Sequence, residues 1–208
     1  MAVTGLLLIG FVLMHLSGNL LVFAGPYLLN VYAEKHRHVP ALLWTARVVL
    51  LAALIAHVVI TVQLAAENRR ARPHRYGQHQ TAETTFAART MMLSGLLLLA
   101  YLAYHLLHFT FRVTNPELSH GVDAFGRHDV YAMVVGSFRR PLISLVYVVG
   151  MAVVCAHLSH GIGSVFQTLG VANAHVVEMA ARVGRLLAVG LFVAYCSIPV
   201  AVMAGLVQ

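Results

Sequence analysis

The chain has 208 residues, of which 60% are apolar and only 10% are charged. Soluble domains carry about 25% charged residues, so this composition excludes a protein whose surface lies mostly in water. The net charge of +7 comes almost entirely from arginine. These arginines lie between apolar stretches rather than along one face, which argues against a nucleic-acid-binding protein.

Five apolar stretches follow one another, near residues 2–25, 41–66, 87–112, 141–166 and 183–207. Each is roughly 20 to 26 residues long, enough for a helix to cross about 30 Å of hydrocarbon. Together they leave no room for a separate soluble domain. The sequence therefore predicts an all-α chain, a single membrane domain over residues 1–208 with five transmembrane helices.

The segments around these stretches set further expectations. The first stretch has no basic residues before it and no small-residue cleavage site, so we expect a retained helix rather than a signal peptide. We expect Asn30–His38 and Val165–Arg182 to be connections and Asp129–Phe138 to form a short interfacial helix. Cys155 and Cys196 lack a CxxC spacing, which indicates small packing residues rather than a disulfide or zinc site. We identify no internal repeat.

Charge predicts the orientation in the membrane. Segment 67–88 is the most basic, and Arg89 follows it directly. Basic loops stay on the cytoplasmic side, which places the N-terminus inside and the C-terminus outside. Arg127, Arg139 and Arg140 lie on the other side and weigh against this orientation.

Four histidines, His15, His57, His105 and His157, lie inside four different apolar stretches. In the predicted orientation His15 and His105 share an outer level, and His57 and His157 share an inner level. The two levels are roughly 10–15 Å apart at 1.5 Å per residue. A buried imidazole needs a partner, and two depth-matched pairs predict two haem irons, each held from both faces by neutral imidazoles.

Other interpretations of these histidines remain open. A lone histidine in a membrane helix most often forms an interhelical hydrogen bond. A metal transporter also uses membrane histidines, but with carboxylates beside them, and the helix interiors contain no Asp or Glu. His108 and His160 each follow a candidate ligand by three residues, so either member of each pair can be the ligand. We favour the deeper His105 and His157 and place the other two at haem edges, near propionates or a quinone.

Several motifs resemble a known family, the cytochrome b subunits of succinate dehydrogenases and fumarate reductases of the five-helix, two-haem type. They are Met-Ala-Val-Thr-Gly at 1–5, His-Leu-Ser-Gly-Asn-Leu at 15–20, Asn30, Tyr32, Tyr104-His-Leu-Leu-His108 and His157-Leu-Ser-His-Gly161. The resemblance covers essentially the whole chain. It implies that His57 and His157 ligate an inner haem b, and His15 and His105 an outer one.

The resemblance also implies partners and a cellular role. The chain would anchor a flavoprotein and an iron–sulfur subunit on the cytoplasmic face of the bacterial inner membrane, in a complex that can form higher oligomers. Electrons from succinate, in the tricarboxylic acid cycle, would pass through the partner subunits and both haems to a quinone. Two-haem members usually use menaquinone, and Glu34 is the nearest match to the family's acidic quinone-site residue. The flavin chemistry would belong to a partner, so this chain would contribute no catalytic residue.

Three further side chains are candidate cofactor contacts. Ser17 and Asn19 flank Gly18, where the first helix is thin enough for a bulky group to lie against its backbone. Arg89 is placed to neutralise propionates of the inner haem, although anchoring at the membrane surface explains it equally well. The alternatives for the whole chain are a cytochrome b of another respiratory dehydrogenase, such as a hydrogenase or formate dehydrogenase, and a histidine-lined metal or solute transporter.

Overall fold

The computed structural model describes residues 1–70, 90–170 and 173–208. Within these residues the secondary structure is helical, apart from one isolated bridge between Val122 and His128. Five helical spans are long and apolar enough to cross a membrane: Ala2–Ala24, Pro40–Asn68, Met91–Thr110, Pro141–Phe166 and Ala174–Met203. The predicted all-α architecture with five such helices is confirmed. By helix length and hydropathy, this is a multi-pass membrane protein.

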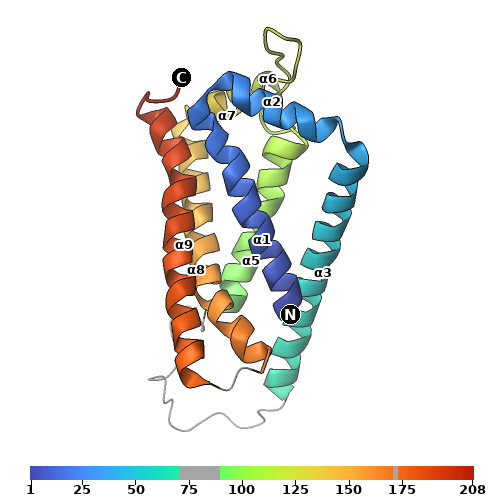
Figure 1. Cartoon of the computed structure of the whole chain (residues 1–208), viewed down its shortest axis with the longest axis vertical. Helices are drawn as coiled ribbons and strands as arrows, with labels where there is room; N and C mark the ends of the chain where they lie inside the picture. The colour runs from blue at the N-terminus through green and yellow to red at the C-terminus, as the bar shows by residue number, and fades with distance from the viewer. Residues whose placement is uncertain (71–89, 171–172) are drawn as a thin grey trace.

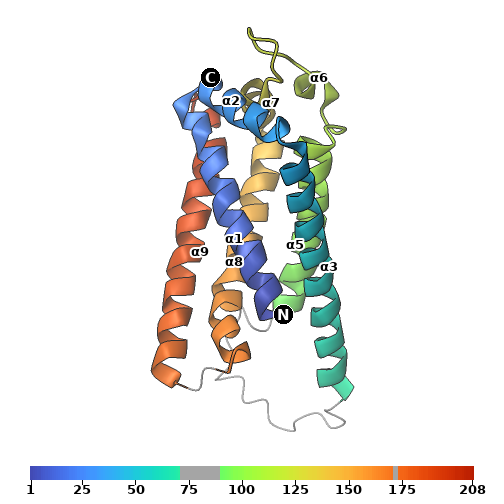
Figure 2. The same ribbon diagram turned by 45° about the vertical axis from the view of Figure 1, so that its right-hand side comes forward.

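The five spans form a bundle that is closed at one end by short helices (Figures 1 and 2). The long elements are α1 (Ala2–Asn19) with the 3-10 segment η1 (Leu20–Ala24), α3 (Pro40–Arg70), α5 (Met91–His105) with the π-helical segment η3 (Leu106–Thr110), α8 (Pro141–Thr168) and α9 (Ala174–Met203). The short ones are α2 (Pro26–Arg37), α6 (Pro116–Ser119) and α7 (Val130–Phe138). We call the end of the bundle that carries these short helices the cap end. The C-terminus lies at the cap end, whereas α1 begins towards the opposite end.

One predicted connection is helical instead. Residues of the expected connection Asn30–His38 belong to α2, which starts at Pro26 after Gly25 with a φ of 93°. Proline at a first helical position is pre-organised for a helix, and the positive φ suits glycine, so this pair both ends η1 and starts α2. The helix expected over Asp129–Phe138 is confirmed as α7.

The connection expected over Val165–Arg182 is longer than the one in the structure. Helix α8 continues to Thr168, and α9 begins at Ala174 rather than near residue 183. The Asn173 side chain accepts two backbone N–H groups at the start of α9. An exposed ion pair of 2.6 Å between Glu178 and Arg182, four residues apart, supports the polar first turns that hydropathy alone would exclude.

Small residues set how closely α8 and α9 approach. A Cβ added to Gly184 would lie 2.8 Å from the Ile162 Cβ, and one added to Gly163 would lie 3.2 Å from the Ala181 Cβ. The two backbones therefore pack at close range, as is usual between membrane helices. Helix α3 packs mainly against α1 and α2. Both cysteines are free, with Cys196 buried and Cys155 half-buried.

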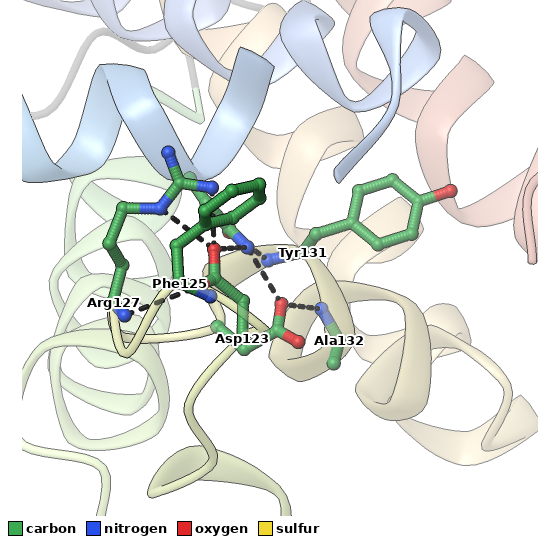
Figure 3. Close-up of polar contacts among 7 residues, drawn as sticks. Asp123, Phe125, Arg127, Tyr131 and Ala132 are labelled. Atoms are coloured by element: carbon green, nitrogen blue, oxygen red, sulfur yellow. Dashed lines mark hydrogen bonds and ion pairs between the residues drawn. The ribbon is translucent and has the colours of Figure 1, made fainter. Parts of the chain in front are cut away.

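The cap end is held together by a buried asparagine, Asn30, which is 1% exposed. Its amide nitrogen donates to Asp123 (3.2 Å) and Asp129 (3.0 Å), and its oxygen accepts the backbone N–H of Tyr131 (3.0 Å). Figure 3 shows this junction, in which the Arg127 guanidinium also pairs with Asp123 at 2.7 Å. The pKa of the Asp123 carboxyl is lowered to about 2, chiefly because the carboxylate accepts a hydrogen bond from that guanidinium. Asn30 thus joins α2 to the loop before α7.

Candidate functional site

His15 on α1 and His105 at the end of α5 meet inside the bundle. Their ring centres are 5.8 Å apart and their planes are nearly perpendicular, at 89°. Two imidazoles bound to one metal ion have ring centres about 6 Å apart, because each metal–nitrogen bond is about 2 Å long. The Nδ1 atom of His105 is buried and has no hydrogen-bond partner among the described residues. The spacing of the pair therefore fits two ligands of one metal ion.

His57 on α3 is held by the start of α1. Its Nδ1 lies 3.2 Å from the hydroxyl of Thr4, and that hydroxyl donates its own proton to the Met1 carbonyl at 2.8 Å. A hydroxyl has one proton to donate, so when the Thr4 hydroxyl donates to Met1, the ring nitrogen is the donor in its contact with His57. In that tautomer the proton of His57 is on Nδ1, and Nε2 carries a lone pair.

His157 on α8 is held in the same way by the start of α5. Its Nδ1 lies 3.1 Å from the Ser94 hydroxyl, which donates to the Met91 carbonyl at 3.0 Å. When that hydroxyl donates to Met91, the proton of His157 is on Nδ1 and Nε2 is an acceptor. Metal-binding histidines almost always donate their second ring N–H to a carboxylate, a backbone carbonyl or water, and here a hydroxyl oxygen lies in that place.

A glycine follows each of these hydroxyl residues and makes room for the ring. A Cβ added to Gly5 would lie 3.7 Å from the Cε1 atom of His57, and one added to Gly95 would lie 3.6 Å from that of His157. Each imidazole thus lies over bare helix backbone. The two inner-level histidines have matched surroundings on two different helices.

This match coincides with two similar stretches of sequence, which are two copies of one pattern. Residues 4–15 are Thr-Gly-Leu-Leu-Leu-Ile-Gly-Phe-Val-Leu-Met-His, and residues 94–105 are Ser-Gly-Leu-Leu-Leu-Leu-Ala-Tyr-Leu-Ala-Tyr-His. Each copy begins with a hydroxyl residue that bonds a histidine of the following long helix and ends with a histidine of the outer pair. Eleven residues separate the two positions in both copies, about 16 Å along a helix. Thr4 and Ser94, which the motif analysis did not select as site residues, are identifiable from this repeated pattern.

His108 differs from His105, although the two share a helix turn. It is fully buried, with Nδ1 2.9 Å from the Tyr147 hydroxyl and Nε2 3.1 Å from both Ser137 Oγ and Asn115 Nδ2. Both ring nitrogens of His108 already have partners inside the protein. The geometry therefore favours His105 over His108 as a ligand and gives His108 a packing role at the cap end.

His160 is half-buried one turn beyond His157 on α8. The hydrogen bond to Ser94 distinguishes His157 from it. Among the described residues, no three His, Cys, Asp or Glu side chains gather into a group that could hold a metal ion. The arrangement consists of histidine pairs.

The remaining candidate contacts have partners within the protein or lie outside the described residues. Ser17 and Asn19 donate to the carbonyls of Met14 and His15, each at 2.7 Å, so both serve the backbone of α1 itself. The bulky group against Gly18 is the Tyr32 ring, whose atoms would lie 2.7 Å from an added Cβ. Glu34 pairs with His38 at 3.2 Å on α2. Arg89 lies outside the described residues.

No protein-family model, curated protein or solved structure matches this chain. The functional argument therefore depends on the residues and their geometry.

Proposed function

We propose that this chain is the cytochrome b membrane anchor of a succinate:quinone oxidoreductase, working as succinate dehydrogenase or fumarate reductase. The observation that carries the proposal is the set of four histidines on four membrane helices. Two are in ring contact, and each of the other two has its Nδ1 within hydrogen-bond distance of a hydroxyl group. Ionisable groups inside a membrane are costly and usually mark a functional site.

The proposal gives each histidine pair one task. His57 and His157 would bind one haem b, and His15 and His105 the other. Two haem b groups bound there would supply one-electron transfer between an iron–sulfur partner and a quinone of the menaquinone type. Bis-histidine ligation uses both axial positions of an iron, which suits electron transfer rather than chemistry at an open site. Thr4 and Ser94 would hold the inner pair in the ligating tautomer.

The charge distribution supports an orientation and a set of partners. Helix α3 ends at Arg70, at the end of the bundle opposite the cap end, and Arg182 and Arg185 lie in the half of α9 nearer to that end. Under the positive-inside rule this end faces the cytoplasm of a bacterial cell. The flavoprotein and iron–sulfur subunits would dock there, close to the His57–His157 level.

Two features favour this function over that of a metal transporter. The described residues contain pairs rather than groups of three or more potential ligands. The inner pair also lacks a carboxylate partner and bonds hydroxyl groups instead. Cation transport sites usually need several oxygen or carboxylate ligands, whereas a haem iron needs two imidazoles.

The test is the haem content of the complex purified from membranes in mild detergent. We expect a b-type reduced-minus-oxidised spectrum, two haems per chain, and reduction of both by succinate. His57→Ala and His157→Ala should each remove one haem and leave the other, while His175→Ala, at an exposed histidine on α9, should retain both. Reduction by hydrogen or formate but not by succinate would assign the chain to a different respiratory dehydrogenase. A stable preparation without haem would reject the proposal.

A further inference from the structure

A groove of about 390 Å³ lies between α8 and α9, the two helices that run side by side in both views of the bundle (Figures 1 and 2). Small residues form its α8 wall, and larger ones form its α9 wall. The lining residues are Ala152, Cys155, Ala156 and Ser159 on α8, and Arg185, Ala188, Val189 and Phe192 on α9. It extends over eight residues of each helix, about 10 Å along the bundle. A volume of this size is typical of a small-ligand site.

The groove has a charged end and an apolar length. Arg185 is its only charged lining residue. Arg182, one turn earlier on α9, is paired with Glu178 at 2.6 Å, whereas Arg185 forms no ion pair with any described residue. The arginine is the twelfth residue of α9 and lies about where the apolar part of this helix begins, and therefore at the depth of lipid headgroups.

We propose that this groove binds an anionic phospholipid of the leaflet at the end opposite the cap end. The Arg185 guanidinium binds the phosphate, and one acyl chain lies along the small residues of α8. Basic pockets between membrane helices on the cytoplasmic side are known to bind anionic headgroups, and arginine binds phosphate through two parallel hydrogen bonds. This proposal is independent of the haem proposal, because no histidine lines the groove.

The lining favours a phospholipid over a quinone. A quinone ring needs hydrogen-bond donors for its two carbonyl groups. The Ser159 hydroxyl already donates to the Ala156 carbonyl at 2.8 Å, so Arg185 is the one strong donor that faces the groove. An acyl chain needs no donor, and its phosphate needs only the guanidinium.

The experiment is a lipid titration of the purified full chain in detergent, monitored by native mass spectrometry, with phosphatidylglycerol and phosphatidylcholine as probes. Arg185→Gln should weaken phosphatidylglycerol binding about fivefold, the effect of one basic residue at an anionic surface. Arg185→Lys should recover most of it, and Arg182→Gln should change it less than twofold. Ala156→Leu, which fills the groove, should reduce binding of both lipids, with Ala52→Leu on an exposed face of α3 as its control.

Each of the other outcomes overturns the proposal. Equal losses in Arg185→Gln and Arg182→Gln would show general attraction of anionic lipid to the basic end. Unchanged binding in both Arg185→Gln and Ala156→Leu would show that the groove is not the site. A co-purifying quinone that is lost on Ala156→Leu, with phospholipid retained, would assign the groove to the quinone instead.

Discussion

Replacing Ser94 by alanine removes the hydroxyl that lies 3.1 Å from His157 Nδ1 and, on the proposed function, should weaken one haem of the two. A buried donor left without a partner costs about 1–3 kcal/mol. When a metal-bound histidine loses the hydrogen-bond partner of its second ring nitrogen, metal binding weakens about 10- to 100-fold. That range equals about 1.4–2.8 kcal/mol, so the two estimates agree. We expect the haem at His157 to dissociate 10- to 100-fold more readily, while the haem at His15 and His105 is retained.

The assay is the transfer of haem from the purified complex to an excess of a haem-scavenging apoprotein, followed optically. Ser94→Thr keeps the hydroxyl and reproduces the arrangement at Thr4, so it should behave like the wild type. Ser197→Ala is the matched control, because the Ser197 hydroxyl bonds only the Ala194 carbonyl of α9, which carries no candidate ligand. Haem transfer from Ser94→Ala within twofold of the wild-type rate would refute the argument from the tautomer. Equal acceleration by Ser197→Ala would refute it as well.

Three further predictions concern the scaffold. Gly150→Ala places a Cβ against the Tyr101 ring and should lower the unfolding free energy by about 1–3 kcal/mol. Thermal denaturation in detergent measures this loss. Gly10→Ala is the control, because its added Cβ meets nothing within 4 Å and should leave the stability unchanged. Asn30→Ala removes three hydrogen bonds at the cap end and should cost about 3 kcal/mol, measured in the same assay; a loss below 0.5 kcal/mol, roughly half of one bond, would contradict it. Because the pKa of Asp123 falls from 3.8 to about 2 on folding, its stabilising effect is complete above pH 3.8 and is lost as the pH falls towards 2. Hydrogen exchange of residues 120–131 should therefore accelerate across that range. Constant protection of these residues down to pH 2 would disprove this.

The sequence was sufficient to predict the spans, because apolar length is a local property. The helix ends were less predictable. Helix α9 starts among polar residues that are held by the Asn173 cap and the Glu178–Arg182 pair, and neither raises hydropathy. Residues 26–37 have too few apolar side chains for a span, so the helix that the Gly25-Pro26 turn starts was not expected.

The histidine residues were identifiable from depth, whereas their partners were not. Depth places His15 beside His105, and the two rings are in contact. The hydroxyl groups of Thr4 and Ser94 are far from the histidines in sequence, so only the packing of α1 on α3 and of α5 on α8 reveals these contacts. Gly18 is a different case. The sequence indicates that a bulky group can lie against this glycine, and in the structure that group is a tyrosine of the same chain.

The most direct test of the central claim is an experimental density map of the purified complex, at a resolution that shows side chains. Our account predicts a porphyrin between His15 and His105 and a second one between His57 and His157, each with Nε2 atoms at the iron. Rings that contact only neighbouring side chains, with no macrocycle between them at either level, would contradict it.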